Sequence, residues 1–138
     1  MIRAVLDTNV AVSALLFGGR ASMVVPAWKR RQFTWLVSQA LLSEYIRVLH
    51  YPKFHLSREE IRALLEEEIL PHITPVKVSR TPRVVRMDPA DDHVLACAAA
   101  GRADLIVTGG HHLLDLAQYR AIPIITIPAF FDRLGLSH

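Results

Sequence analysis

Five short runs of apolar, mostly β-branched residues alternate with segments whose apolar residues recur at helical spacing. This alternation is the feature that most constrains the fold. The runs have the length and composition of strands and cover residues 2–6, 33–37, 73–78, 105–108 and 122–127. Strands that alternate with helices predict a parallel sheet with helices on both faces. We therefore expect an α/β fold with about five parallel strands, formed as a single domain over residues 1–138.

Helices are expected over residues 9–17, 22–31, 39–49, 58–70, 89–101, 113–117 and 128–134. Ser57 and Glu60 have the spacing of a capping box, which marks a helix start. Pro75 cannot donate a backbone hydrogen bond, so the third strand is predicted to be short or to lie at an edge of the sheet. Residues 80–87 are expected to form a loop.

The composition fits a globular protein, with 51% hydrophobic and 21% charged residues. Cys97 is the only cysteine, so no disulfide forms within the chain, and we interpret it as a small core residue. No apolar run reaches the roughly 18 residues of a membrane span, and the N-terminus lacks signal-peptide features. These features predict a cytoplasmic protein that does not bind a membrane. The net charge of +3 permits nucleic-acid binding without demonstrating it.

Asp7 ends the first predicted strand and is followed by Thr8 and Asn9. In open parallel sheets, ligands bind beyond the carboxyl ends of the strands. An acid at this point is therefore placed for chemistry. The alternative is that Asp7 only caps the next helix, a role that aspartate favours. The sequence around Asp7, taken alone, supports a role in chemistry and a role in helix capping about equally.

Two further acids have patterns that favour a functional role. Glu44 shares a predicted helix face with Leu41 and Val48, although it could also lie at the edge of that stripe and reach solvent. Asp91 and Asp92 start the next helix. Acids in a first turn commonly complement the helix dipole, which explains one of the pair more easily than both.

Asp7, Glu44 and Asp92 are predicted to converge at one end of the sheet. Three neighbouring carboxylates repel one another unless a cation neutralises them. Oxygen ligands select hard ions such as Mg²⁺ or Mn²⁺. Such an ion activates water and stabilises charge on a phosphodiester. On a basic protein, this chemistry indicates a nucleic-acid substrate.

Four motifs resemble those of PIN-domain nucleases in order and spacing, and the resemblance covers nearly the whole chain. They are Leu6-Asp7-Thr8-Asn9-Val10, Ser43-Glu44-Tyr45, Asp92-His93-Val94-Leu95-Ala96 and Val107-Thr108-Gly109. The branch with the greatest similarity is the VapC-like toxins of toxin–antitoxin systems. The resemblance implies RNA cleavage dependent on Mg²⁺ or Mn²⁺, an antitoxin partner and a homodimer. It assigns the catalytic, metal-binding acids to Asp7, Glu44 and Asp92, with Asn9 and Thr108 as helpers.

The sequence departs from this family at Gly110, where members usually have an aspartate after the fourth strand. His111 and His112 follow, with Asp115 one turn later. Either histidine could ligate a metal ion, but we favour a helix start at which both contact solvent or phosphate. A glycine here is also compatible with a left-handed backbone, which would disfavour a side chain.

Two other function classes remain open. A PIN domain weakened by Gly110 would bind RNA or a protein partner without turnover. A haloacid-dehalogenase-like or receiver-like phosphotransfer protein also places an aspartate at a strand end. Haloacid-dehalogenase-like proteins usually have a second aspartate at the position that Asn9 occupies here. Receiver-like proteins usually have a lysine after a late strand, but no lysine follows Lys77. Apolar residues of the helix expected over 58–70 and of the last strand and helix predict a partner surface, among them Phe130, Phe131 and Leu134.

Overall fold

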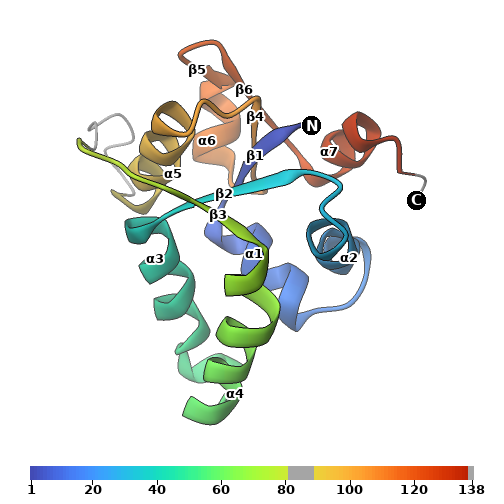
Figure 1. Ribbon diagram of the computed structural model, residues 1–138, viewed down its shortest axis with the longest axis vertical. Helices are drawn as coiled ribbons and strands as arrows, with labels where there is room; N and C mark the ends of the chain where they lie inside the picture. The colour runs from blue at the N-terminus through green and yellow to red at the C-terminus, as the bar shows by residue number, and fades with distance from the viewer. Residues whose placement is uncertain (81–88, 137–138) are drawn as a thin grey trace.

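The computed structural model describes residues 1–80 and 89–136, so most of the predicted 80–87 loop lies outside the described residues. Within the described part, six strands form one sheet in the order β3-β2-β1-β4-β6-β5 (Figure 1). The strands are β1 (Arg3–Leu6), β2 (Thr34–Ser38), β3 (Ile73–Val76), β4 (Leu105–Val107), β5 (Gln118–Tyr119) and β6 (Ile122–Ile125). All neighbouring pairs are parallel except β5 and β6. The α/β fold with a mostly parallel sheet is therefore confirmed.

Strand β5 was not predicted. It is two residues long and pairs antiparallel with β6, with Tyr119 opposite Ile122. The turn between them consists of Arg120 and Ala121, both with positive φ (48° and 64°). Such turns usually carry glycine or asparagine, and a two-residue strand shows no periodicity, so the sequence held no signal for this hairpin.

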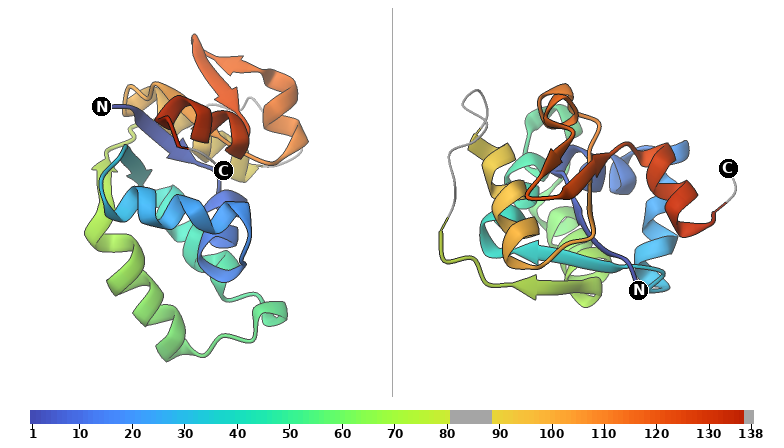
Figure 2. Two further views of the ribbon diagram at one scale, coloured as in Figure 1. Left: turned by 90° about the vertical axis from the view of Figure 1, so that its right-hand side faces the viewer. Right: turned by 90° about the horizontal axis from the view of Figure 1, so that it is seen from above.

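The helices lie on both faces of the sheet, as predicted. The α-helices are α1 (Thr8–Leu16), α2 (Val24–Lys29), α3 (Gln39–Leu49), α4 (Arg58–Ala63), α5 (Pro89–Ala100), α6 (His111–Leu116) and α7 (Ile127–Leu134). In Figures 1 and 2, α1 to α4 lie on one side of the sheet and α5 and α6 on the other. In the described ranges no single helix is long and apolar enough to cross a membrane; only α1 taken together with the segment Arg20–Lys29, bent by 94°, has that length and composition.

The helical connections are less regular than predicted. A 3₁₀ turn η1 (Arg20–Met23) precedes α2, and another, η2 (Pro52–Phe54), follows α3. The expected helix over 58–70 is α-helical only in α4, continues as the π-helix η3 (Leu64–Ile69) and ends in the 3₁₀ turn η4 (Leu70–His72). Its predicted capping box is present, because Ser57 and Glu60 each accept a hydrogen bond from the other's backbone N–H.

The C-terminal aromatic residues belong to the core. Phe130 and Phe131 are fully buried, and the Phe130 ring meets Phe33 edge to face at 5.0 Å between centroids. The prediction that these residues form an exposed partner surface is therefore wrong. The 127–134 segment is amphipathic, and local sequence does not show which face a terminal helix turns towards the sheet. Leu134 is only partly buried.

Cys97 is fully buried in α5, as interpreted from its alanine-rich surroundings. Burial raises the pKa of its thiol to about 11. The thiol is therefore protonated at neutral pH and behaves as a small core residue.

Gly101 follows α5 where the backbone passes close to β2 and β3. A Cβ added there would lie 3.0 Å from the Cys97 carbonyl oxygen and from Val76 Cγ2, and 3.1 Å from Leu36 Cδ1. We expect Gly101→Ala to lower the free energy of unfolding by about 1–3 kcal/mol through overpacking, as measured by urea denaturation. Gly18→Ala is the matched control, since its Cβ would have nothing within 4 Å. Equal stability of the two variants would contradict this close approach.

Candidate functional site

The order of the strands creates a switch point between β1 and β4. The chain leaves β1 into α1 on one face of the sheet and leaves β4 towards α6 on the other (Figure 2). Crevices at such points bind ligands in open α/β sheets. Asp7 immediately follows β1 and Thr108 immediately follows β4, so the structure brings these two predicted site residues together.

The carboxylate of Asp7 is held by β4 rather than by its own helix. Asp7 occupies the N-cap position of α1, but its side chain makes no capping hydrogen bond. The Thr108 hydroxyl instead donates to Asp7 Oδ2 at 2.6 Å, and the Gly110 N–H donates to Thr108 Oγ1 at 2.9 Å. Asp7 is only 7% exposed. Helix capping therefore does not explain this residue, and a hydroxyl donor suits an ionised carboxylate.

Tyr45 ties α3 to the same end of the sheet. Its ring is fully buried, and its hydroxyl donates a 2.6 Å hydrogen bond to the carbonyl oxygen of Leu6. Burial raises the pKa of the Tyr45 phenol well above its ordinary value, so the phenol keeps its proton and remains a donor. Because Leu6 precedes Asp7 and Glu44 precedes Tyr45, this bond brings the helix that carries Glu44 to the strand that carries Asp7.

Glu44 lies at the edge of the buried stripe and pairs with Arg47. Its side chain is 16% exposed, whereas that of Arg47 is 59% exposed. Arg47 Nε donates to Glu44 Oε2 at 3.1 Å, and Arg47 Nη2 contacts Oε1. The carboxylate raises the pKa of the Arg47 guanidinium. Both oxygens of Glu44 thus contact Arg47, and a cation at Glu44 would either share the carboxylate with this guanidinium or replace it.

The first turn of α5 carries two buried acids. Asp91 is 8% and Asp92 5% exposed. Helix α5 packs against α3 and β1, the elements that carry or precede the other two candidate acids. Acids that only complemented the helix dipole would gain nothing from burial. His93 follows them, and its Nδ1 is buried without a hydrogen-bond partner among the described residues.

Gly110 faces the Asp7 carboxylate. Its φ of −85° and ψ of 131° are ordinary extended values, so the left-handed backbone considered from the sequence is wrong. A Cβ at this position would lie 3.5 Å from Thr108 Oγ1 and 3.7 Å from Asp7 Oδ2, which are normal contacts. A side chain therefore fits here and would extend from beside Asp7. His111 and His112 are the first residues of α6 and are exposed, in line with the helix start favoured from the sequence.

The side chains around Asp7 offer the oxygen atoms that a hard cation binds. Those that the structure describes are not arranged as a metal site. The buried groups near the switch point are oxygen donors, and the Oγ1 of Thr8, next to Asp7, is buried without a hydrogen-bond partner in the described chain. Oxygen donors are the ligands that Mg²⁺ and Mn²⁺ prefer. No group of three or more His, Cys, Asp or Glu residues in the described ranges is arranged to hold a metal ion, however.

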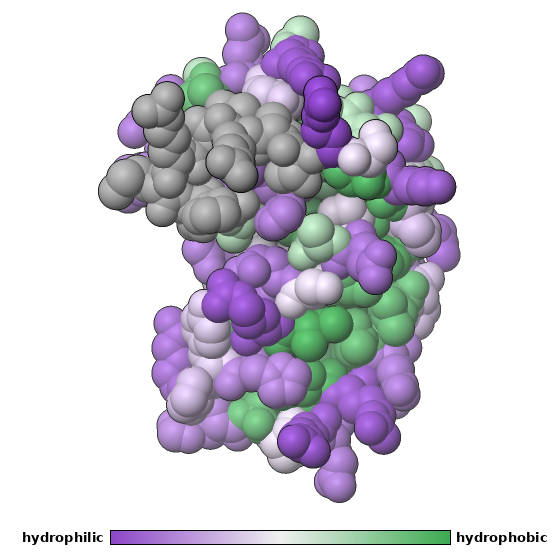
Figure 3. Space-filling view, turned by 90° about the vertical axis from the view of Figure 1, so that its left-hand side faces the viewer, coloured by the Kyte–Doolittle hydropathy of each residue, from purple (hydrophilic) through white to green (hydrophobic). Residues whose placement is uncertain are grey.

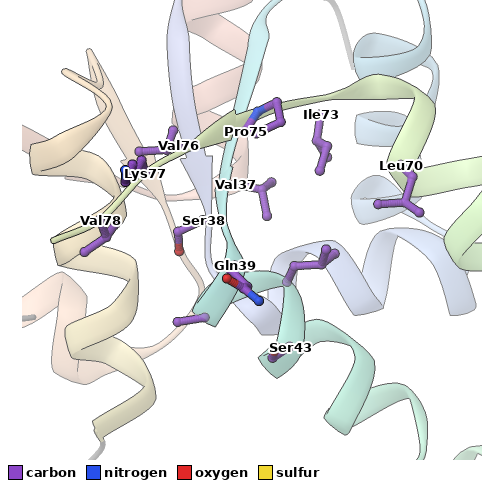
Figure 4. A pocket seen from close by; sticks show the side chains of 12 residues that line it. Val37, Ser38, Gln39, Ser43, Leu70, Ile73, Pro75, Val76, Lys77 and Val78 are labelled. Atoms are coloured by element: carbon purple, nitrogen blue, oxygen red, sulfur yellow. The ribbon is translucent and has the colours of Figure 1, made fainter.

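A large hollow on the described surface is lined by none of the candidate acids. Its volume is about 930 Å³, and it lies where α3 begins and along the edge strand β3 (Figure 4). Figure 3 shows apolar residues gathered on the face that α3 and β3 form. Lys77 is its one charged lining residue in the described chain. Its described lining residues include no acid that could hold a metal ion.

A smaller cavity of about 300 Å³ contains residues that the sequence analysis did not single out. Phe17, Tyr51 and Phe54 line it together with Lys53 and the predicted helper Asn9. The signal that was overlooked is the interleaving of aromatic and basic residues in Tyr51-Pro52-Lys53-Phe54, a pattern typical of nucleic-acid surfaces.

Taken together, the fold and the acid at its switch point define an α/β domain with a buried, oriented carboxylate at the usual ligand crevice. Residues 3–112 match the sequence family described as "PIN domain", and the chain belongs to this family, whose members are in general nucleases and usually metal-dependent. The structure is similar to the crystal structure of FitAcB from Neisseria gonorrhoeae. The TM-score is 0.56 at 17% identity, with 90% of this chain and 97% of that chain covered, which shows a shared fold. A comparison with curated proteins gives no significant match.

Proposed function

We propose that this protein is a metal-dependent endoribonuclease and the toxin of a toxin–antitoxin pair. The observation that carries the proposal is the buried carboxylate of Asp7, placed at the switch point and oriented by Thr108. Membership of the PIN-domain family supports nuclease chemistry. The alternative function, a haloacid-dehalogenase-like or receiver-like phosphotransfer protein, has no support from this family membership.

Each residue of the site has a role in this proposal. Asp7, Glu44 and Asp92 would hold the cation, Mg²⁺ or Mn²⁺, which would supply an activated water and neutralise charge on the phosphodiester. Thr108 fixes the direction of the Asp7 carboxylate through its 2.6 Å hydrogen bond. The supporting residues are Thr8 and Asn9 directly after Asp7, Asp91 directly before Asp92, and His111 and His112 shortly after Thr108.

The competing function is a PIN domain that binds RNA or a protein without cleaving RNA. Two observations favour it: Gly110 supplies no fourth acid, and Arg47 occupies both oxygens of Glu44. Incubation of the purified protein with single-stranded RNA and Mg²⁺, Mn²⁺ or EDTA separates the two functions. We expect cleavage with a metal ion and none with EDTA. RNA binding with no cleavage in either metal would identify the binding protein.

The proposed partners follow from the resemblance to VapC-like toxins. They are an RNA substrate, a cognate antitoxin and a second copy of this chain, all in the cytoplasm. Because Phe130 and Phe131 are core residues, the homodimer must use another face. We expect light scattering at micromolar concentration to give the mass of two chains. The mass of one chain would contradict the homodimer without affecting the proposed chemistry.

A further inference from the structure

The cavity of about 300 Å³ lies between α1, the end of α3 and the turn that follows α3. Asn9, two residues after Asp7, lines it from the first turn of α1. Val48, which also lines it, lies four residues after Glu44 on α3. Four residues of helix correspond to roughly 6 Å. The cavity therefore begins about one helical turn from Glu44, and Phe17 at its far end lies ten residues after Asp7, roughly 15 Å along α1.

Aromatic side chains form its walls. Phe17 is 52% exposed, an unusual state for such a large apolar ring. Its ring lies 5.8 Å from that of Phe54, at an angle of 58°. Tyr51 also lines the cavity. The site thus presents aromatic faces to solvent.

Cations flank these rings. Lys53 Nζ lies 5.2 Å from the centroid of the Phe54 ring, and Arg47 Cζ lies 5.5 Å from that of Tyr51. Arg47 also holds Glu44, so one side chain links the cavity to a candidate metal ligand. Among the described residues that line the cavity there is no acid. The charge at its edge therefore suits an anion.

We propose that this cavity binds one base of a single-stranded RNA a short way along the strand from the cleavage site, with the base stacked on the exposed ring of Phe17, which Phe54 supports from the side, and a neighbouring phosphate on Lys53. Aromatic rings combined with cations are the usual means of holding single strands without sequence preference, because every base has a π-face and every nucleotide a charge. The proposal rests on the proposed ribonuclease function, for which it supplies a substrate subsite. It also explains why an exposed phenylalanine stands beside a basic edge.

The test measures RNA binding separately from cleavage. A fluorescein-labelled single strand of roughly ten nucleotides is titrated in EDTA with the Asp7→Asn protein, and fluorescence anisotropy gives Kd. We expect Phe17→Ala and Phe54→Ala each to raise Kd about tenfold. Phe17→Leu keeps the apolar bulk without the π-face and is expected to bind as weakly as Phe17→Ala, whereas Phe17→Tyr retains binding. Leu70→Ala is the matched control, since Leu70 is also exposed (42%) but lines the other hollow.

Lys53 has a different expected signature. For single strands, log Kd depends on log salt with a slope of about 0.7 per phosphate contact. Lys53→Ala is therefore expected to reduce this slope by about 0.7. Phe17→Ala should leave the slope unchanged, because stacking releases no counterion. Thermal melts of all variants show whether the fold is retained.

The outcomes distinguish failure of this inference from failure of the proposed function. If the wild type cleaves RNA but the folded Phe17→Ala and Phe54→Ala variants bind RNA like their parent, the base subsite is overturned and the ribonuclease stands. If those variants lose RNA binding but the wild type cleaves nothing, the subsite stands on a non-catalytic RNA-binding domain. If they keep RNA binding and lose a protein partner instead, the cavity is a protein-docking site and the proposal is overturned.

Discussion

Asp7→Asn is expected to abolish metal-dependent RNA cleavage while leaving the fold intact. The amide oxygen can still accept the hydrogen bond from Thr108, so the geometry between β1 and β4 persists. The substitution removes the negative charge that attracts a cation. Loss of a residue that only supports a metal ligand typically costs 10–100-fold, so loss of the ligand itself should exceed about a hundredfold in cleavage rate. The measurement is single-turnover cleavage of single-stranded RNA with saturating Mn²⁺.

Stability gives an independent reading of the same variant. A buried carboxylate near other acids is destabilised by desolvation and repulsion. The free energy of unfolding without metal should therefore hold or rise slightly in Asp7→Asn. Asp132→Asn, an exposed acid in α7, is the control and should change neither rate nor stability. Unchanged nuclease activity in Asp7→Asn would remove the catalytic role of Asp7, and a large loss of stability would make the variant uninformative about chemistry.

Gly110→Asp is expected to strengthen metal binding. The extended backbone and the ordinary contact distances at Gly110 allow a side chain. Its Cβ would lie 3.7 Å from Asp7 Oδ2, so the new carboxylate adds a donor beside Asp7. We expect Mn²⁺ affinity to rise by about tenfold or more, as measured by isothermal titration. Without metal the variant should melt at a lower temperature, because the two carboxylates repel, and Mn²⁺ should reverse this loss.

The same position predicts which metal supports activity. Mg²⁺ demands near-ideal octahedral oxygen coordination, whereas Mn²⁺ accepts nitrogen more readily and binds more tightly. With Gly110 in place of an acid, wild-type activity should be low with Mg²⁺ and clearly higher with Mn²⁺. Gly110→Asp should narrow that difference. Gly109→Asp is the matched control, because a Cβ there has nothing within 4 Å.

A folded Gly110→Asp variant with no gain in metal affinity or activity would show that this position is not a vacated ligand site. His111, His112 and Asp115 would then be the residues to examine. All three are exposed on α6, directly after the switch point. Their substitution by alanine would test whether an imidazole or the later acid Asp115 binds the metal in place of the aspartate that is absent at Gly110.

The sequence by itself determined the architecture and the position of the central acid. Alternating strand and helix patterns predicted the α/β fold, because side-chain periodicity is local and parallel strands require crossover connections. It also placed Asp7 directly after the first strand, since that position depends only on where an apolar run ends. The two-residue strand β5 could not be predicted from the sequence, because its turn contains Arg120 and Ala121 at positive φ and no glycine.

Only the tertiary structure decided which groups meet. Thr108 holds Asp7 across 101 residues of sequence, and Tyr45 reaches Leu6 across 39. The burial of Phe130 depends on which helix face turns inwards. The pairing of Glu44 with Arg47, by contrast, joins residues three apart on one helix and is a local contact. Local patterns predict a helix and its apolar stripe but not the neighbour against which it packs. The orientation of the acid and the aromatic cavity beside it arise from contacts between segments that are close only in the folded chain.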